Sequence, residues 1–91
     1  AARAAIAAQR VLIVEDDEAA RLGLTELVRT WGFTVEAAAD GEAALQAVTA
    51  FRPTIVVSDL VMPKMDGLQL LAALGDDLSH IYFVLLTAQG T

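Results

Sequence analysis

Two short segments of the chain place carboxylate side chains directly after an apolar run. The first segment is Val-Leu-Ile-Val followed by Glu15, Asp16 and Asp17, and the second is Ile-Val-Val-Ser followed by Asp59. A hard cation such as Mg²⁺ is bound through one or two carboxylates and keeps several of its waters. If the two segments are neighbours in the fold, their carboxylates form a divalent cation site. One of these carboxylates can then act as a nucleophile toward an activated phosphoryl group.

Acids at such positions can also serve structure, by capping the helix that follows. Asp17 and Asp66 each stand where an amphipathic segment begins, and a carboxylate there accepts hydrogen bonds from free backbone N–H groups. Gln69 follows Asp66 at the spacing of a capping box. Asp59 does not fit this structural role, because Pro63 and turn residues separate it from the next helix. We therefore expect Asp17 and Asp66 to be caps and Asp59 to be a functional group.

The apolar periodicity predicts four strands that alternate with three helices. Runs of strand length occupy residues 11–14, 33–37, 54–58 and 81–86, and helical spacing fills residues 17–31, 40–52 and 66–75. Residues 76–80 are expected to form a polar loop. Strict alternation of strands and helices is typical of a parallel sheet with helices on both faces. Ligand sites in such sheets lie beyond the carboxyl ends of the strands, where all the acids singled out here are found.

The same periodicity predicts which side chains are buried. In the first helix, one apolar stripe is formed by Ala20, Leu24, Leu27, Val28 and Trp31. Trp31 is expected to pack in the core. Tyr82 and Phe83, in the last strand, are expected to be core residues too.

Composition bounds the class of protein. The 91 residues suffice for one domain, and 56% hydrophobic with 20% charged residues is typical of a globular chain. No apolar run reaches 18 residues and no cysteine is present, so we expect a soluble, cytoplasmic protein that does not enter a membrane. The net charge is −6 and the six cations are scattered, which argues against direct nucleic-acid binding.

Four motifs, in order and at helix-length spacing, resemble one family. They are Val14-Glu15-Asp16-Asp17, Ser58-Asp59-Leu60-Val61-Met62-Pro63, Met65-Asp66-Gly67 and Thr87-Ala88. From about Arg10 to Ala88 the chain resembles the receiver domain of two-component response regulators. The resemblance implies the CheY-like fold, an α/β doubly wound parallel sheet, truncated here to four strands in the order 2-1-3-4 and three helices. Residues 10–91 would form the receiver domain. Residues 1–9 are an alanine-rich extension, either a linker or the end of a helix that docks on the domain or a partner.

The resemblance also implies residue roles. Asp59 matches the aspartate that accepts a phosphoryl group from a sensor histidine kinase. Asp16 matches the direct Mg²⁺ ligand, Glu15 its partner acting through a bound water, and the backbone carbonyl of Val61 a further ligand. Thr87 matches the hydroxyl residue that moves to bind the phosphoryl group and so passes on a conformational signal. Such a domain is not an enzyme beyond its own phosphotransfer and autodephosphorylation.

A metal-dependent phosphatase is a rival reading, because it also uses a nucleophilic aspartate after a parallel strand. Such an enzyme needs a second acid two residues beyond the nucleophile as its acid–base group. Val61 occupies that position, which argues against the phosphatase.

The chain departs from the family pattern at its end. Family members continue through another helix, a fifth strand and a final helix, and the fifth strand carries a lysine and an aromatic switch residue. No residue up to Thr91 matches either, and Lys64 is expected to be a solvated loop residue. Three explanations compete. The chain is part of a longer regulator with an output domain, or it covers the sheet edge formed by residues 81–86 through dimerisation or exchange of elements, or it is a minimal monomer. The second would make the chain a phosphorylation-incompetent interaction module.

Overall fold

The computed structural model describes residues 5 and 8–87, so the prediction for residues 1–9 lies largely outside the described residues. The four strands are β1 (Arg10–Val14), β2 (Thr34–Ala38), β3 (Ile55–Asp59) and β4 (Tyr82–Leu86). The helices are α2 (Glu18–Thr30), α3 (Gly41–Phe51) and α4 (Gly67–Leu74), and a 3₁₀ helix η1 (Gly75–His80) follows α4. Among the described residues, no helix has the length and apolar content needed to cross a membrane.

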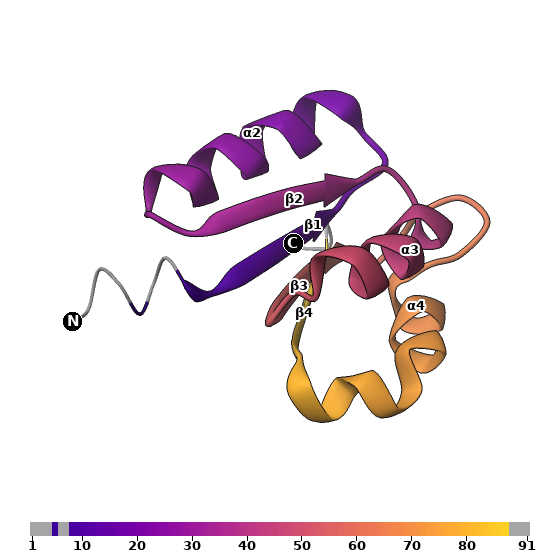
Figure 1. The fold of residues 1–91 in the computed structure, drawn as a ribbon. Coiled ribbons are helices and arrows are strands. Elements are labelled where there is room, and N and C mark those ends of the chain that lie inside the picture. Colours follow the sequence, from indigo (N-terminus) through magenta and orange to yellow (C-terminus); the bar gives the residue numbers. More distant parts are fainter. Residues whose placement is uncertain (1–4, 6–7, 88–91) are drawn as a thin grey trace.

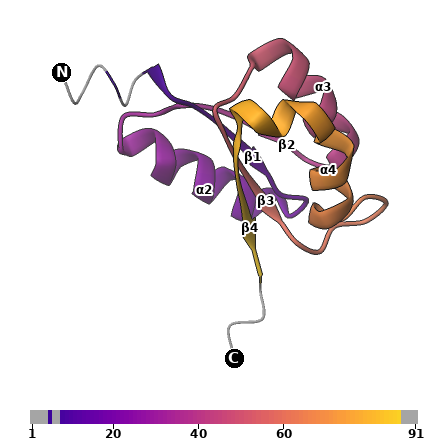
Figure 2. The same cartoon turned by 90° about the horizontal axis from the view of Figure 1, so that it is seen from below.

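All strand pairs are parallel, and the strand order is β2-β1-β3-β4. This confirms the predicted CheY-like order 2-1-3-4. Figure 1 shows α2 on one side of the sheet and α3 and α4 on the other, and the turned view in Figure 2 gives the same arrangement. The order reverses between β1 and β3, so the carboxyl ends of these two strands lie at the switch point of the sheet.

Each face of the sheet carries its own apolar cluster. In β1, Leu12 and Val14 point into the larger cluster, formed with residues of α3 and α4, and both are almost fully buried. Val11 and Ile13 point to the opposite face and pack with Val35 and with residues of α2. A strand covered on both faces has no polar position, which is why residues 11–14 read as an unbroken apolar run.

The three helices begin where the sequence predicts, each behind an aspartate N-cap. The side chains of Asp17, Asp40 and Asp66 accept hydrogen bonds from backbone N–H groups three residues later, at 2.7–2.8 Å. The Gln69 side chain accepts a return bond from the N–H of Asp66, so the predicted capping box is present. These caps fix where each loop at the carboxyl edge of the sheet ends.

Three predicted core residues and one predicted loop were wrong. Leu27 and Trp31 are 47% and 59% exposed, because α2 buries only the Leu24 and Val28 side of its stripe against the sheet. Tyr82 is 81% exposed, since it lies on the outermost strand and no described helix covers it there. Residues 76–80 form part of η1 rather than a loop, because the chain turns at Gly75 and continues as a tighter helix.

Candidate metal centre

The register of the sheet brings Glu15 and Asp59 to the same level. Val14 lies opposite Ser58 in the parallel β1–β3 pair, so the residue that follows each of them emerges at the same edge. The backbone N–H of Glu15 donates to the carbonyl of Ala38 at 3.1 Å, which extends the pairing of β1 with β2 by one residue. Backbone pairing alone therefore places Glu15 beside Asp59.

Glu15, Asp16 and Asp59 form the predicted acidic cluster. Each offers one carboxylate oxygen, and these oxygens all lie within 4.8 Å of one another. Octahedral Mg²⁺ with ligand distances of about 2.0–2.1 Å spans roughly 3–4 Å between two ligand oxygens. Three carboxylates at this spacing fit the ion, with direct ligands or with a water between one carboxylate and the metal. Glu15 is nearly buried and Asp16 is exposed, so the cluster is open to solvent on one side.

The pKa of the Glu15 carboxyl is raised by its surroundings. Burial raises its pKa above the ordinary glutamate value, and the negative charges of Asp59 and Asp16 act in the same direction. A hydrogen bond of 3.0 Å from the backbone N–H of Asp17 to Oε2 of Glu15 opposes this shift. A bound cation would offset the cost of burying the negative charge of Glu15 and would reduce its repulsion by Asp16 and Asp59. The electrostatics of the metal-free cluster therefore favour cation binding.

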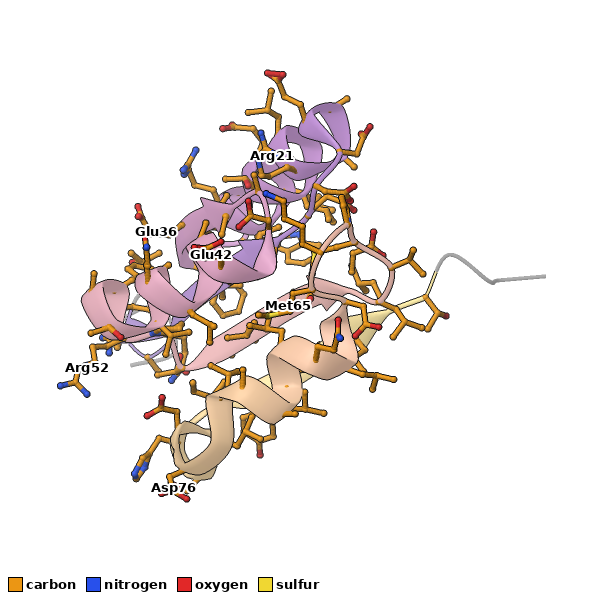
Figure 3. The ribbon with its side chains drawn as sticks, turned by 90° about the vertical axis from the view of Figure 1, so that its right-hand side faces the viewer. Arg21, Glu36, Glu42, Arg52, Met65 and Asp76 are labelled. Carbon is orange, nitrogen blue, oxygen red and sulfur yellow. The ribbon has the colours of Figure 1, made fainter. Side chains whose placement is uncertain are left out.

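Two methionines anchor the loop that follows Asp59. Met62 is 6% exposed and inserts into the larger apolar cluster. Met65 packs against α3, where an added Cβ at Gly41 would lie 2.6 Å from its sulfur, and Figure 3 shows it between α3 and α4. Val61, just before the first anchor, is 74% exposed, and Lys64, between the two anchors, is exposed with a φ of 70°. The loop is thus held at two points, while Val61 and Lys64 remain at its surface.

Thr87 follows β4 directly, next to the end of β3. Asp59 lies opposite Leu86 in the β3–β4 pair, and the N–H of Leu60 donates to the carbonyl of Leu86 at 2.9 Å. Thr87 is therefore one residue beyond the partner of Asp59, and its side chain is exposed. Ala88, the other residue of this predicted motif, lies outside the described residues.

Two contacts with the backbone of the site were not predicted. The N–H of Gly67 donates to the carbonyl of Leu60 at 2.8 Å, and an added Cβ at Gly67 would lie 2.6 Å from the carbonyl oxygen of Asp59. On the other side of the site, Nη1 of Arg21 donates to the carbonyl of Glu15 at 3.0 Å and more weakly to that of Asp16 at 3.4 Å. The only sequence signals for these contacts were a glycine at a helix start and a cation in the first turn of α2.

The comparison with protein families decides the family. The model of the response regulator receiver domain matches residues 11–91, which is most of the chain. The chain belongs to this family. Response regulators MprA of Mycolicibacterium vanbaalenii and Mycobacterium ulcerans are both 43% identical over 72 residues, which cover 76% of this chain. The chain spans 31% of the length of these relatives.

Solved receiver structures share the fold. The chemotaxis protein CheY4 of Vibrio cholerae superimposes with a TM-score of 0.84 at 28% identity, over 91% of this chain and 71% of that one. The response regulator TrrA of Thermotoga maritima, in complex with Mg²⁺ and BeF, gives a TM-score of 0.83 at 28% identity. That match covers 90% of this chain and 71% of TrrA. The predicted CheY-like receiver fold is confirmed.

Proposed function

We propose that this receiver domain accepts a phosphoryl group on Asp59 from a sensor histidine kinase, with Mg²⁺ bound by Glu15, Asp16, Asp59 and the carbonyl of Val61. The observation that carries the proposal is the convergence of three carboxylates from two different strand ends within 4.8 Å. Asp59 is the member best suited to be the nucleophile. It is half-buried at the end of β3, and among the described residues its carboxylate caps no helix and forms no ion pair.

The transfer is a substitution at phosphorus. A carboxylate oxygen of Asp59 forms the new P–O bond while the P–N bond of the donor phosphohistidine breaks, and the leaving imidazole nitrogen keeps the electron pair and takes a proton. Bound Mg²⁺ would neutralise charge on the carboxylates and on the phosphoryl oxygens. The residues of this chain hold the acceptor: β3 fixes its backbone, and the buried Met62 limits the movement of the loop behind it.

Thr87 supplies the link from chemistry to shape. A phosphoryl group adds about two negative charges and three strong acceptor oxygens at the end of β3. We assign to the Thr87 hydroxyl the role of donating to one of these oxygens, because the Leu60–Leu86 hydrogen bond holds its segment beside the acceptor. Movement of Thr87 would carry the end of β4 with it, and β4 forms the outer strand of the described sheet. In the cytoplasm, this change would be passed to an output domain; the MprA relatives have room for one, because the matched region covers 31% of their length.

Intact-mass spectrometry with a small phosphodonor tests the proposal. The protein is incubated with acetyl phosphate and Mg²⁺, and the parent chain should gain one phosphoryl group. Asp59→Asn should gain none, and the matched control Asp76→Asn, an exposed acid in η1, should label like the parent. Chelation of Mg²⁺ should abolish labelling of the parent. Labelling of Asp59→Asn, or labelling that persists without a divalent cation, would contradict the assignment.

One observation favours a second candidate function, self-association through β4. Tyr82 and Val84 are 81% and 42% exposed, and within the described sheet β4 pairs only with β3. An apolar outer strand with free backbone groups is a surface on which another chain can add. Sedimentation velocity over a hundredfold range of concentration tests this, with Tyr82→Lys as the variant. A mass that stays monomeric at all concentrations would exclude self-association. If Asp59→Asn assembles like the parent, self-association does not depend on phosphorylation.

A further inference from the structure

Arg21 holds the loop that carries two of the three acids. It lies in the first turns of α2 and is half-buried. Its Nη1 donates to the carbonyls of Glu15 and Asp16, at 3.0 and 3.4 Å, rather than to any carboxylate. Figure 3 labels this side chain on α2. A cation beside an acidic cluster normally pairs with a carboxylate, so a guanidinium directed at the two carbonyls calls for a different role.

The backbone of Arg21 is held in place from both directions along the helix. Its backbone N–H donates to the carbonyl of the N-cap Asp17 at 2.8 Å. Its carbonyl accepts a hydrogen bond of 2.7 Å from Oγ1 of Thr25, which is the buried residue of α2. The guanidinium therefore extends from a fixed point of α2 to the loop. Both hydrogen bonds to the loop come from Nη1, and the rigid plane of the guanidinium fixes the direction of its N–H groups, whereas the ammonium of a lysine rotates at the end of a flexible stem.

Few other contacts fix this loop. The N–H of Glu15 pairs with Ala38, and the Glu15 carboxylate accepts from the N–H of Asp17. Among the described residues, the carbonyls of Glu15 and Asp16 accept hydrogen bonds only from Arg21. Rotation of either peptide unit would turn the attached carboxylate away from Asp59. The contact with Arg21 opposes this rotation.

We infer that Arg21 is a positioning residue, which raises the affinity of the acidic cluster for Mg²⁺ by fixing the carbonyls of Glu15 and Asp16. This inference rests on the proposed function. It makes a prediction opposite in sign to that of charge alone. A positive charge near the cluster repels Mg²⁺, so its removal would strengthen Mg²⁺ binding if charge were its only effect. Loss of positioning weakens binding instead.

The test compares Arg21→Gln and Arg21→Lys with the parent and with Arg29→Gln. Arg29 is the matched control, because it lies on the same helix in an exposed pair with Glu26, at 2.7 Å. Mg²⁺ dissociation constants are measured by calorimetry. Loss of a group that orients a metal ligand typically weakens metal binding about 10- to 100-fold. We expect about tenfold weaker binding in Arg21→Gln, clear weakening in Arg21→Lys, and no change in Arg29→Gln. Binding by Arg21→Gln that equals or exceeds that of the parent would overturn the inference.

A second measurement separates positioning from misfolding and from failure of the proposed function. Phosphoryl labelling is followed as a function of Mg²⁺ concentration, and Arg21→Gln should need more Mg²⁺ for half-maximal rate while it reaches the rate of the parent at saturation. A plateau that stays low while Mg²⁺ affinity is unchanged would overturn the positioning role. A parent that binds Mg²⁺ but is not labelled refutes phosphoryl acceptance, and the calorimetric comparison still decides the role of Arg21. A parent that binds no Mg²⁺ overturns both.

Discussion

The same substitution, glycine to alanine, should have opposite effects on stability at Gly67 and at Gly23. At Gly67, the first residue of α4, an ideal Cβ would lie 2.6 Å from the carbonyl oxygen of Asp59 and 2.6 Å from a methyl carbon of Leu85. Optimal separations of non-bonded carbon atoms are about 3.5–4.0 Å. The Leu85 side chain can rotate away, but the carbonyl belongs to β3 and cannot move alone. The start of α4 must therefore shift by several tenths of an ångström from the strand that carries the acceptor.

The magnitude follows from two opposing terms. Overpacking of a close contact costs about 1–3 kcal/mol, and the shift also weakens the 2.8 Å hydrogen bond from Gly67 to Leu60. Alanine gains at most about 1 kcal/mol over glycine in a helix interior. A net loss of about 1–2 kcal/mol lowers the Tm of a domain of this size by roughly 4–16 °C. Gly23 is the matched control: it lies within α2, is exposed, and has no heavy atom within 4 Å of its ideal Cβ. Gly23→Ala should stabilise by up to about 1 kcal/mol.

Thermal unfolding followed by far-ultraviolet circular dichroism measures both variants, without divalent cations so that metal binding does not contribute. Labelling by acetyl phosphate is then measured well below the melting temperature of Gly67→Ala. Because the shift of α4 weakens the hydrogen bond from Gly67 to Leu60, the residue that follows Asp59, labelling should be slower in Gly67→Ala and unchanged in Gly23→Ala. A Gly67→Ala variant that melts at or above the Tm of the parent would contradict this prediction, since it would show that α4 moves away at no cost.

Three further predictions concern the edge of the site. The raised pKa of Glu15 means that the folded protein binds this proton more tightly than the unfolded chain does. Stability is therefore lost as pH rises from the ordinary glutamate range through the raised value. Glu15→Gln should remove this loss of stability, raise the urea midpoint at neutral pH without metal, and weaken Mg²⁺ binding. An equal midpoint for both proteins across this pH range would contradict that. Asp66→Ala breaks the capping box and should cost about 1 kcal/mol, with a Tm lower by about 4–8 °C; an unchanged Tm would show that the cap is dispensable. Gly41→Ala should also be destabilising, because its Cβ would lie 2.6 Å from the sulfur of Met65 and 2.9 Å from the Cβ of Met65, so the loop that carries Met65 must move. Calorimetric melting measures this, and a Tm equal to that of the parent would contradict it.

The sequence predicted the elements and the acidic cluster because both depend on local patterns. A strand covered on both faces must be apolar throughout, so residues 11–14 could be recognised without knowing what covers them. Parallel strands end at one edge of the sheet, so the acids after β1 and β3 could be expected to meet once the alternation of strands and helices was recognised. The structure places Glu15, Asp16 and Asp59 together as expected. The roles of these residues stay predictions.

Burial at the margins could not be predicted, because it depends on which neighbours an element has. Helical spacing identifies the apolar stripe of α2 but not how much of it the sheet covers, and Leu27 and Trp31 lie on the uncovered side. Alternation along β4 assigns Tyr82 to a face of the sheet but not whether a helix lies over it. Both errors came from treating an apolar residue as evidence of burial, whereas much of a folded surface is apolar.

The two contacts that were not predicted from the sequence share a physical feature, because both are made with backbone atoms. A carboxylate cluster can be recognised from residue type, because carboxylate oxygens are ligands for hard cations such as Mg²⁺. Arg21 and Gly67 contact the carbonyls of Glu15 and Asp59, and every residue has a carbonyl, so no partner type marks these contacts in the sequence. Yet the direction of a carboxylate is set by the peptide unit that carries it. In the proposed function, the acids supply the ligands for the cation, while Arg21 and Gly67 contact the backbone that carries the acids. We therefore expect that a chain with all three acids but a bulky residue at position 67 would keep the acidic cluster and still label poorly.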